Sequence, residues 1–328
     1  MRGSRATPAV CTGRPGEPSM GGRRAIILCF AAAAVLALPW AIDARYVLFV
    51  CNLAMIYAIL AIGLNLLMGY GGQISVGHAA FFGIGAYASA ILCVDHGWSF
   101  WTALPAAVLV AAACGLLLGV PTLRTRGHYL ILATLGFGEI VRLVLQNWQT
   151  VTKGPTGIVG IPPVTIAGLS FAREQRFYYI ALAFLVLALI VARRVVRTRS
   201  GRELITVRDN ELAAELMGVP TTRVKLFAFT ISAAFAGLAG SLYAHMNSFI
   251  SPDVFTFELS VLVLIMVMLG GAGTLYGPVL GALVLTGLPE ILRDFKQVYL
   301  ILYGLGILAL SLFLPRGIAG LLPKAADR

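Results

Sequence analysis

The sequence predicts an all-α protein that crosses a membrane about ten times, within a range of eight to ten. Of its 328 residues, 59% are hydrophobic and only 12% are charged, whereas about a quarter of the residues are charged in typical soluble domains. Long runs of the chain contain no Asp, Glu, Lys or Arg, and two of these runs are interrupted by glycine clusters. So few charges cannot cover a soluble surface, and most of the surface is therefore expected to face lipid.

The charge-free runs locate the spans, because an α-helix needs about 20 apolar residues to cross a bilayer. The run 46–94 is too long for one helix, and its glycine-rich middle, 69–77, divides it into two spans. A second cluster, 270–277, divides the run 259–289 in the same way. The expected spans are 25–42, 46–68, 79–94, 100–123, 128–146, 177–192, 226–246, the two halves of 259–289, and 297–315. Paired glycine interruptions of this kind are typical of the binding region of a transporter.

The basic residues predict the orientation of the chain. With the N-terminus in the cytoplasm, 18 of the 25 Lys and Arg residues fall on the cytoplasmic side and six fall outside, while Arg142 lies within a span. This bias follows the positive-inside rule and explains the net charge of +11 without a nucleic-acid partner. We expect residues 1–24 to be a disordered cytoplasmic N-terminus (with Met20 as an alternative start), 25–322 the transmembrane domain, and 323–328 a cytoplasmic tail.

The cytoplasmic loop 193–225 carries eight of the basic residues and two helix signatures. Ser200 and Glu203 form a capping-box pattern that predicts the start of a first helix. Asn210 is a favourable N-cap for a second helix, which Gly218 would end.

The second of these helices, 211–217, is expected to be amphipathic. Glu211 and Glu215 would be exposed, while Leu212, Leu216 and Met217 offer an apolar side. The helix could lie on the inner leaflet or dock on a cytoplasmic protein. Its carboxylates would be repelled by an anionic membrane surface, and this repulsion favours a protein partner.

Polar side chains within the spans are candidates for a translocation path, because they are costly in lipid and usually face a cavity or a partner. Several lie in or before the break 69–77, where the alternative is a helix–helix contact. Glu139 and Arg142 are three residues apart on one helix, so they are expected to pair, either as a structural ion pair or in gating or a subunit interface. The candidates are Asn65, Gln73, Ser75, His78, Glu139 and Arg142. Neither the four histidines nor the five cysteines show ligand spacing, and no metal site is predicted.

Five stretches carry a resemblance to a known family. They are GLNLLMGYGGQISVGHAAF (63–81), YLILATLGFGE (129–139), GPTGI (154–158), SGRELITVRDNELAAELMG (200–218) and MLGGAGTLYGP (268–278). Together they resemble the LivM-type permease of branched-chain amino-acid ABC importers, over about residues 46–322. The resemblance implies a fold of the ABC-importer permease type in a bacterial cytoplasmic (inner) membrane.

The resemblance also implies partners: a homologous second permease subunit, two cytoplasmic ATPase subunits and an extracytoplasmic substrate-binding protein. It places the coupling helix that meets the ATPase within 203–218. The family's loop pattern is Glu-Ala-Ala, three residues, Gly; here Leu212 stands at the glutamate position, with Glu211 beside it. The residues implied for this helix are Glu203, Arg208, Asp209, Asn210, Glu211, Leu212, Ala213, Ala214, Glu215 and Gly218.

The chain is expected to be a transport subunit without a catalytic site or cofactor of its own. It contains no G-x-x-x-x-G-K-[ST] motif, so ATP would bind to another subunit. The substrate would be a branched-chain or other small amino acid, with urea or a short amide as the alternative. An ion-coupled transporter would favour buried acids in several spans, whereas here the deep acids are few, namely Glu139 and Glu290. The exact substrate and a homo- or heterodimeric permease pair stay open.

Overall fold

The computed structural model describes residues 39–40, 44–122, 128–166, 169–171, 173–291, 304 and 317–321. The chain divides into two units, residues 1–43 and 44–328. Only residues 39–40 of the first unit are described, so the expected boundary at residue 24 and most of the first expected span lie outside the described residues. The tenth span, 297–315, also lies outside them apart from residue 304. The architecture below is that of the second unit.

Eight apolar helices in the described part of the chain correspond to eight of the ten expected spans. Five of them are long and apolar enough to cross a membrane. They are α2 (Arg45–Asn65) with its continuation η1 (Leu66–Tyr70), α4 (Phe100–Thr122), α5 (His128–Asn147), α7 (Glu174–Arg197) and α10 (Thr221–Asn247). The three shorter ones are α3 (His78–Val94), α11 (Phe257–Gly270) and α12 (Gly277–Ile291). The prediction of a polytopic α-helical membrane protein is confirmed.

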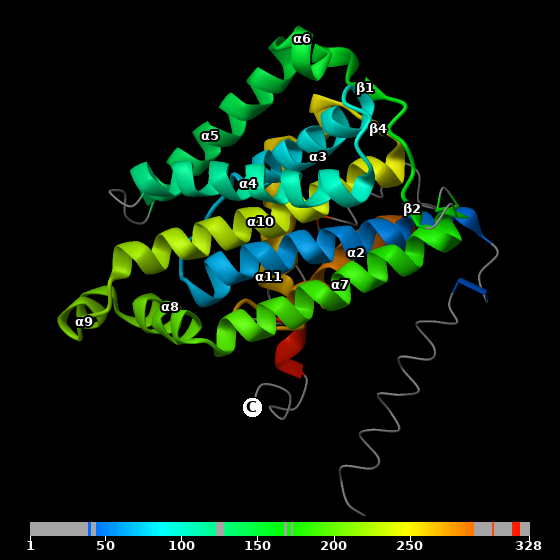
Figure 1. The fold of residues 1–328 in the computed structure, drawn as a ribbon. Coiled ribbons are helices and arrows are strands. Elements are labelled where there is room, and N and C mark those ends of the chain that lie inside the picture. The colour runs from blue at the N-terminus through cyan, green and yellow to red at the C-terminus, as the bar shows by residue number, and fades with distance from the viewer. Residues whose placement is uncertain are drawn as a thin grey trace, which may run out of the picture. The chain divides into compact units, whose positions relative to one another are not determined.

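Helix α10 lies at the centre of the packing. It packs most extensively against α4 and α3 and then against α2, which in turn packs against α7 and α12; Figure 1 shows α2, α7 and α10 running side by side. Small residues permit the close approach. A Cβ atom on Gly85 of α3 would overlap the backbone of Gly237 in α10, and one on Gly237 would overlap the Ala111 side chain of α4. Small contact residues are the usual means by which membrane helices pack closely.

The polar connections lie at two opposite ends of these helices (Figure 1). One end carries η1 and the helices α8 (Arg199–Asp209) and α9 (Glu211–Leu216). The other carries α6 (Gln149–Thr152), the turn η2 (Gly154–Thr156), η3 (Pro252–Val254) and four two-residue strands, β1 (Ile158–Val159) paired with β4 (Phe249–Ile250) and β2 (Thr165–Ile166) paired with β3 (Leu169–Ser170). A short helix, η4 (Ile318–Leu321), follows near the C-terminus. The expected cytoplasmic loop and the expected external loop are thus at opposite ends.

Helices α4, α5 and α7 leave much of their apolar surface exposed. Leu117, Tyr129 and Leu187 are examples, with 73%, 73% and 49% of their surface accessible. In water such surfaces would be unstable, but in a bilayer they are the expected lipid-facing or partner-facing sides.

Candidate functional site

The two glycine-rich breaks meet at the side chain of Asn65, the last residue of α2. The Asn65 Nδ2 donates to the Thr274 carbonyl oxygen at 2.8 Å, and its Oδ1 accepts from the Gly273 amide at 2.8 Å. An asparagine amide is both a donor and an acceptor, so one side chain binds two consecutive residues in the middle of the 270–277 turn. We call Asn65, Gly69, Gly273 and Thr274 the Asn65 junction. Asn65 is buried, and the structure therefore joins the two interruptions that the sequence placed about 200 residues apart.

The start of the first break is a π-helix rather than irregular backbone. Residues 66–70 continue α2 as the wider helix η1, and the chain leaves helical structure only after Tyr70. A Cβ atom on Gly69 would overlap both Asn65 Oδ1 and the Gly273 amide nitrogen. Short π-helical segments occur frequently at functional sites. Here the segment brings a residue without a side chain against the second break.

Arg208, near the C-terminal end of α8, connects this end of the molecule to the junction. Its Nη1 donates to the Gly69 carbonyl oxygen at 2.8 Å, and its Nε and Nη2 donate to Asp209 Oδ1 at 3.1 and 2.9 Å. Gly72, with a φ of +67°, packs against the Arg208 side chain, which a Cβ atom at this position would overlap. The structure thus places one of the expected coupling residues in direct contact with the first break.

Helix α9 begins as the sequence predicts. The Asn210 side chain accepts from the Ala213 amide at 3.0 Å, and Gly218, with a φ of +79°, follows the helix. The predicted start of α8 is wrong. Thr198, not Ser200, is its N-cap and accepts from the Gly201 amide at 3.3 Å. Glu203 pairs with Arg199 instead of returning to a cap residue.

The outward face of α9 agrees with the expectation only in part. Leu212, Leu216 and Met217 are 68%, 82% and 82% exposed. The carboxylates are engaged within the chain: Glu211 pairs with Lys225, and Glu215 accepts from the Thr221 hydroxyl at 3.0 Å. The predicted exposure of both acids is therefore correct in part, since Glu211 is half-buried and Glu215 is exposed but hydrogen-bonded. The exposed side chains of Leu212, Leu216 and Met217 are apolar, and we call them the α9 apolar face.

The second half of the first break is buried among α2, α5, α10 and α11. His78 Nε2 lies 2.6 Å from Ser232 Oγ, which donates to the Gly63 carbonyl oxygen at 2.6 Å. Because the one hydroxyl proton is used on Gly63, His78 Nε2 must carry a proton and donate. Ser75 Oγ accepts from the Gly77 amide at 3.4 Å. Gln73 Nε2 and His78 Nδ1 are buried and have no hydrogen-bond partner among the described residues.

Three polar residues in apolar helices support this segment, and sequence reasoning did not single them out. Thr134 Oγ1 accepts from the Val76 amide at 3.1 Å, and Ser260 Oγ accepts from the Ala79 amide at 3.0 Å. Ser232 binds His78 as described above. The sequence shows each of them only as a hydroxyl residue within a mostly apolar span. A single hydroxyl residue, however, does not indicate its partner.

Glu139 and Arg142 form the expected ion pair on α5. Arg142 Nε donates to both carboxylate oxygens at 3.0 and 3.1 Å, and the side chains remain 42% and 27% exposed, respectively. Glu139 lines a small pocket between α3, α5 and α11. The other lining residues are Val76, Ala79, Ala80, Leu135, Gly138, Phe255, Thr256, Phe257 and Ser260. The six path candidates therefore occupy three places: the junction, the buried break and the side of α5.

A further buried network lies at the opposite end. His245 Nδ1 donates to the Pro162 carbonyl oxygen at 2.7 Å, and its Nε2 accepts from Ser89 Oγ at 3.0 Å. Ser241 donates to Ser89 at 2.8 Å. This chain of bonds attaches α10 and α3 to the loop that carries β1 and β2. Within the described part of the protein, no three His, Cys, Asp or Glu residues form a group that could hold a metal ion.

Comparison with known proteins identifies the family. The family model described as "Branched-chain amino acid transport system / permease component" matches residues 46–318. The chain belongs to this permease family. The matched range includes both breaks, the Asn65 junction, and helices α8 and α9.

Several curated relatives in this permease family are similar over most of the chain. The high-affinity branched-chain amino acid transport system permease protein LivM of Escherichia coli K12 is 41% identical over 315 residues, covering 89% of this chain and 74% of the relative. The LivH permease protein of the same system and strain is 28% identical over 82% of this chain and 92% of its own length. The autoinducer 2 import system permease protein LsrC of Enterobacter sp. 638 is 32% identical, covering 75% of this chain and 72% of its own. No solved structure matches the chain.

Proposed function

We propose that the chain is the membrane-spanning permease subunit of an ATP-binding-cassette importer for a branched-chain or other small amino acid. The observation that carries the proposal is the contact of Arg208 with Gly69, at 2.8 Å. It connects a polar helix pair with an exposed apolar face to the two interruptions of the membrane helices. An importer driven by a separate ATPase needs such a connection, whereas an ion-coupled transporter does not.

The proposed mechanism passes a movement from the ATPase to the membrane helices. The ATPase binds the α9 apolar face, and α8, which follows the same movement, carries Arg208. Arg208 pulls on the Gly69 carbonyl oxygen, and Asn65 transmits the displacement to Gly273 and Thr274 through its two hydrogen bonds. Because α3 and α12 begin just after the breaks, their ends move together and open the path alternately to the two sides.

The assembly that we propose contains this chain, a homologous second permease subunit, two ATPase subunits and an extracytoplasmic binding protein, in a bacterial inner membrane with both termini cytoplasmic. The names of the LivM and LivH relatives support a pair of different permeases, since both assign a permease protein to the same transport system. ATP would be bound by the ATPase subunits alone.

The substrate is proposed from the relatives and from the polar residues. The relatives with 41% identity are named for branched-chain amino acids, while LsrC is named for autoinducer 2, so the family accommodates different small solutes. Asn65, Gln73 and Ser75 offer neutral polar groups to the candidate path, and the charges of Glu139 and Arg142 are paired with each other, which suits a small solute without net charge. Urea and short amides are the alternative substrates, and a panel of labelled solutes distinguishes them from leucine.

A charge on the α9 apolar face tests the proposal. We expect Leu216→Glu to abolish co-purification of the ATPase subunits and ATP-dependent leucine uptake, because a carboxylate cannot be buried in an apolar interface without a partner. The side chain is 82% exposed, so the fold should be unaffected. Thr206→Glu, at an exposed position of α8, adds the same charge and is the control. Uptake that persists in Leu216→Glu, or without the ATPase subunits, would contradict the proposal.

A further inference from the structure

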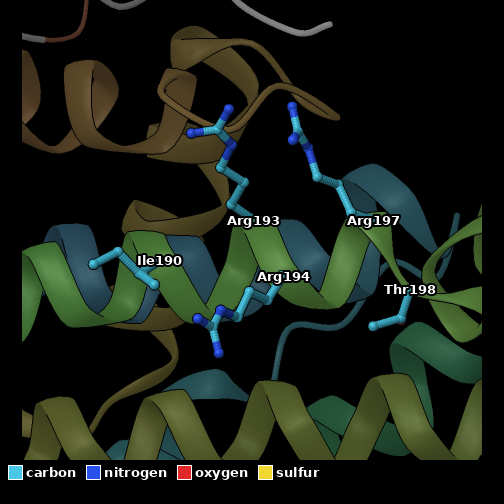
Figure 2. Close-up of a pocket in the computed structure, with 5 residues that line it drawn as sticks. All are labelled: Ile190, Arg193, Arg194, Arg197 and Thr198. Carbon is cyan, nitrogen blue, oxygen red and sulfur yellow. The ribbon is translucent and has the colours of Figure 1, made fainter.

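Three arginines gather where α7 ends and α8 begins. Arg193, Arg194 and Arg197, together with Ile190 and Thr198, line a pocket with a volume of about 540 Å³. Figure 2 shows Arg193 and Arg197 projecting from one side of α7 and Arg194 from the other. Residues four apart lie on the same face of a helix, so Arg193 and Arg197 form one cationic pair. Among the residues that the structure describes, no acidic side chain lines the pocket.

These arginines carry uncompensated charge. Among the described residues, none of the three is in an ion pair, and the nearby Glu203 is engaged by Arg199. Like charges four residues apart on a helix repel each other. An anion between Arg193 and Arg197 would relieve this repulsion, and a phosphate group has the acceptor geometry that guanidinium groups prefer.

The surface that leads to the arginines is apolar. Val186 and Ile190 precede Arg193 and Arg197 at spacings of three and four residues, which form one stripe along α7, and they are 47% and 48% exposed. The neighbouring Leu187 and Val191 are also exposed, at 49% and 37%. A ligand that fits the whole stripe has an anionic group at one end and hydrocarbon at the other. A soluble protein would not cover this stripe, because its residues lie on a helix that crosses the bilayer.

We propose that this pocket binds the phosphate headgroup of an anionic phospholipid, with an acyl chain lying along Val186 and Ile190. The inference rests on the proposed orientation, which places this end of α7 at the cytoplasmic leaflet. Basic clusters that directly follow a membrane helix are typical sites for anionic lipids. Free phosphate shares the headgroup chemistry but would gain nothing from the apolar stripe.

The position of the site gives the lipid a role in transport. Thr198 both lines the pocket and caps α8, accepting from the Gly201 amide. A bound headgroup fixes the corner between α7 and α8, and α8 carries Arg208 to the Asn65 junction. The lipid therefore fixes the position of α8, the helix through which the ATPase acts. Transport is expected to be faster in membranes that contain anionic lipid.

Lipid binding to the purified full chain tests the site without requiring transport. Native mass spectrometry and thermal unfolding are measured after addition of phosphatidylglycerol, phosphatidylcholine or inorganic phosphate. We expect phosphatidylglycerol alone to be retained and to raise the unfolding temperature. Arg197→Gln should weaken its binding about fivefold, and Arg193→Gln with Arg197→Gln by the square of that factor, since each arginine near an anionic surface contributes about one such factor. Arg197→Lys should retain most of the binding.

The matched control is Arg223→Gln, which removes one exposed cation at the same end of the molecule but from α10. It should bind phosphatidylglycerol as the unaltered chain does. Equal losses in Arg223→Gln and Arg197→Gln, unchanged binding in the double variant, or equal stabilisation by inorganic phosphate would overturn the proposal. Since neither ATPase nor substrate is present, failure here is distinct from failure of the importer proposal.

Discussion

At the scale of single residues, the Asn65 junction depends on the side-chain amide of Asn65 and on the absence of a side chain at Gly69. Asn65 uses its acceptor on Gly273 and its donor on Thr274. Gly69 lies so close that any side chain would displace this amide. The glycine is therefore required for space, and the asparagine for its two hydrogen bonds.

Gly69→Ala tests the space requirement. We expect the substitution to lower the free energy of unfolding by about 1–3 kcal/mol, the usual range for overpacking a buried site, and to impair transport. Gly136→Ala, on α5, has no atom within 4 Å of the added Cβ and should be neutral or stabilising by up to about 1 kcal/mol. Thermal unfolding of the two purified variants makes the comparison, and equal unfolding temperatures would refute the overlap at Gly69.

The sequence could indicate these residues but not their contacts. Asn65 was a candidate because it is polar within a span, and the glycine clusters were recognised as interruptions. Their meeting depends on a turn about 200 residues away, and no local pattern encodes that distance. The same holds for Ser232 and Ser260, whose hydroxyls look interchangeable in sequence and acquire roles only through packing.

At the scale of elements, helix α8 connects α9 to the first glycine-rich break. One end carries the α7–α8 corner with Thr198, and the other presents Arg208 to the Gly69 carbonyl oxygen. The bond is charge-assisted and only partly exposed, so it contributes more than a surface ion pair. Coupling between the ATPase and the membrane helices should therefore depend on α8.

Arg208→Gln is expected to separate assembly from coupling. The shorter side chain cannot reach Gly69, and the loss of a charged hydrogen bond, about 1.5–3 kcal/mol, should reduce leucine uptake by about tenfold or more. The ATPase subunits should still co-purify, because the α9 apolar face is unchanged. Arg199→Gln, which removes an exposed ion pair with Glu203, should leave uptake nearly unchanged. Normal uptake in Arg208→Gln would exclude this route.

Element boundaries show where sequence reasoning succeeds. Long apolar runs, one of them interrupted by Glu139 and Arg142, predicted eight helices of the described chain because apolar length is a direct requirement of the bilayer. The caps Asn210 and Gly218 were correct because their signals are local. The start of α8 was missed because Thr198 competes with Ser200 two residues earlier. The outward face of α9 was partly wrong because Lys225 and Thr221, from α10, bind its acids.

At the scale of the whole molecule, the two polar ends have different constructions. The end with α8 and α9 is basic and carries an exposed apolar face. The opposite end is built from short strands and turns, and β1 and β4 hold the loops together. His245 attaches this end to the helices through Pro162. The proposed orientation assigns the first end to the cytoplasm and the second to the outside.

Cysteine labelling tests this orientation. In a background from which the five native cysteines have been removed, Leu212→Cys and Val159→Cys introduce thiols at positions that are 68% and 69% exposed. A membrane-impermeant maleimide added to intact cells should label Val159→Cys only. Inverted membrane vesicles should give the opposite result. Labelling of Leu212→Cys from outside intact cells would reverse the orientation.

The amide of Asn65 also limits how many independent motions this end of the protein has. In the sequence, the breaks look like two separate joints, each able to bend without the other. Two hydrogen bonds from one rigid planar group tie them together, so any shift at the end of α2 displaces the start of α12 as well. A movement applied to the end of α2 is therefore expected to reach the turn between α11 and α12 through one side chain.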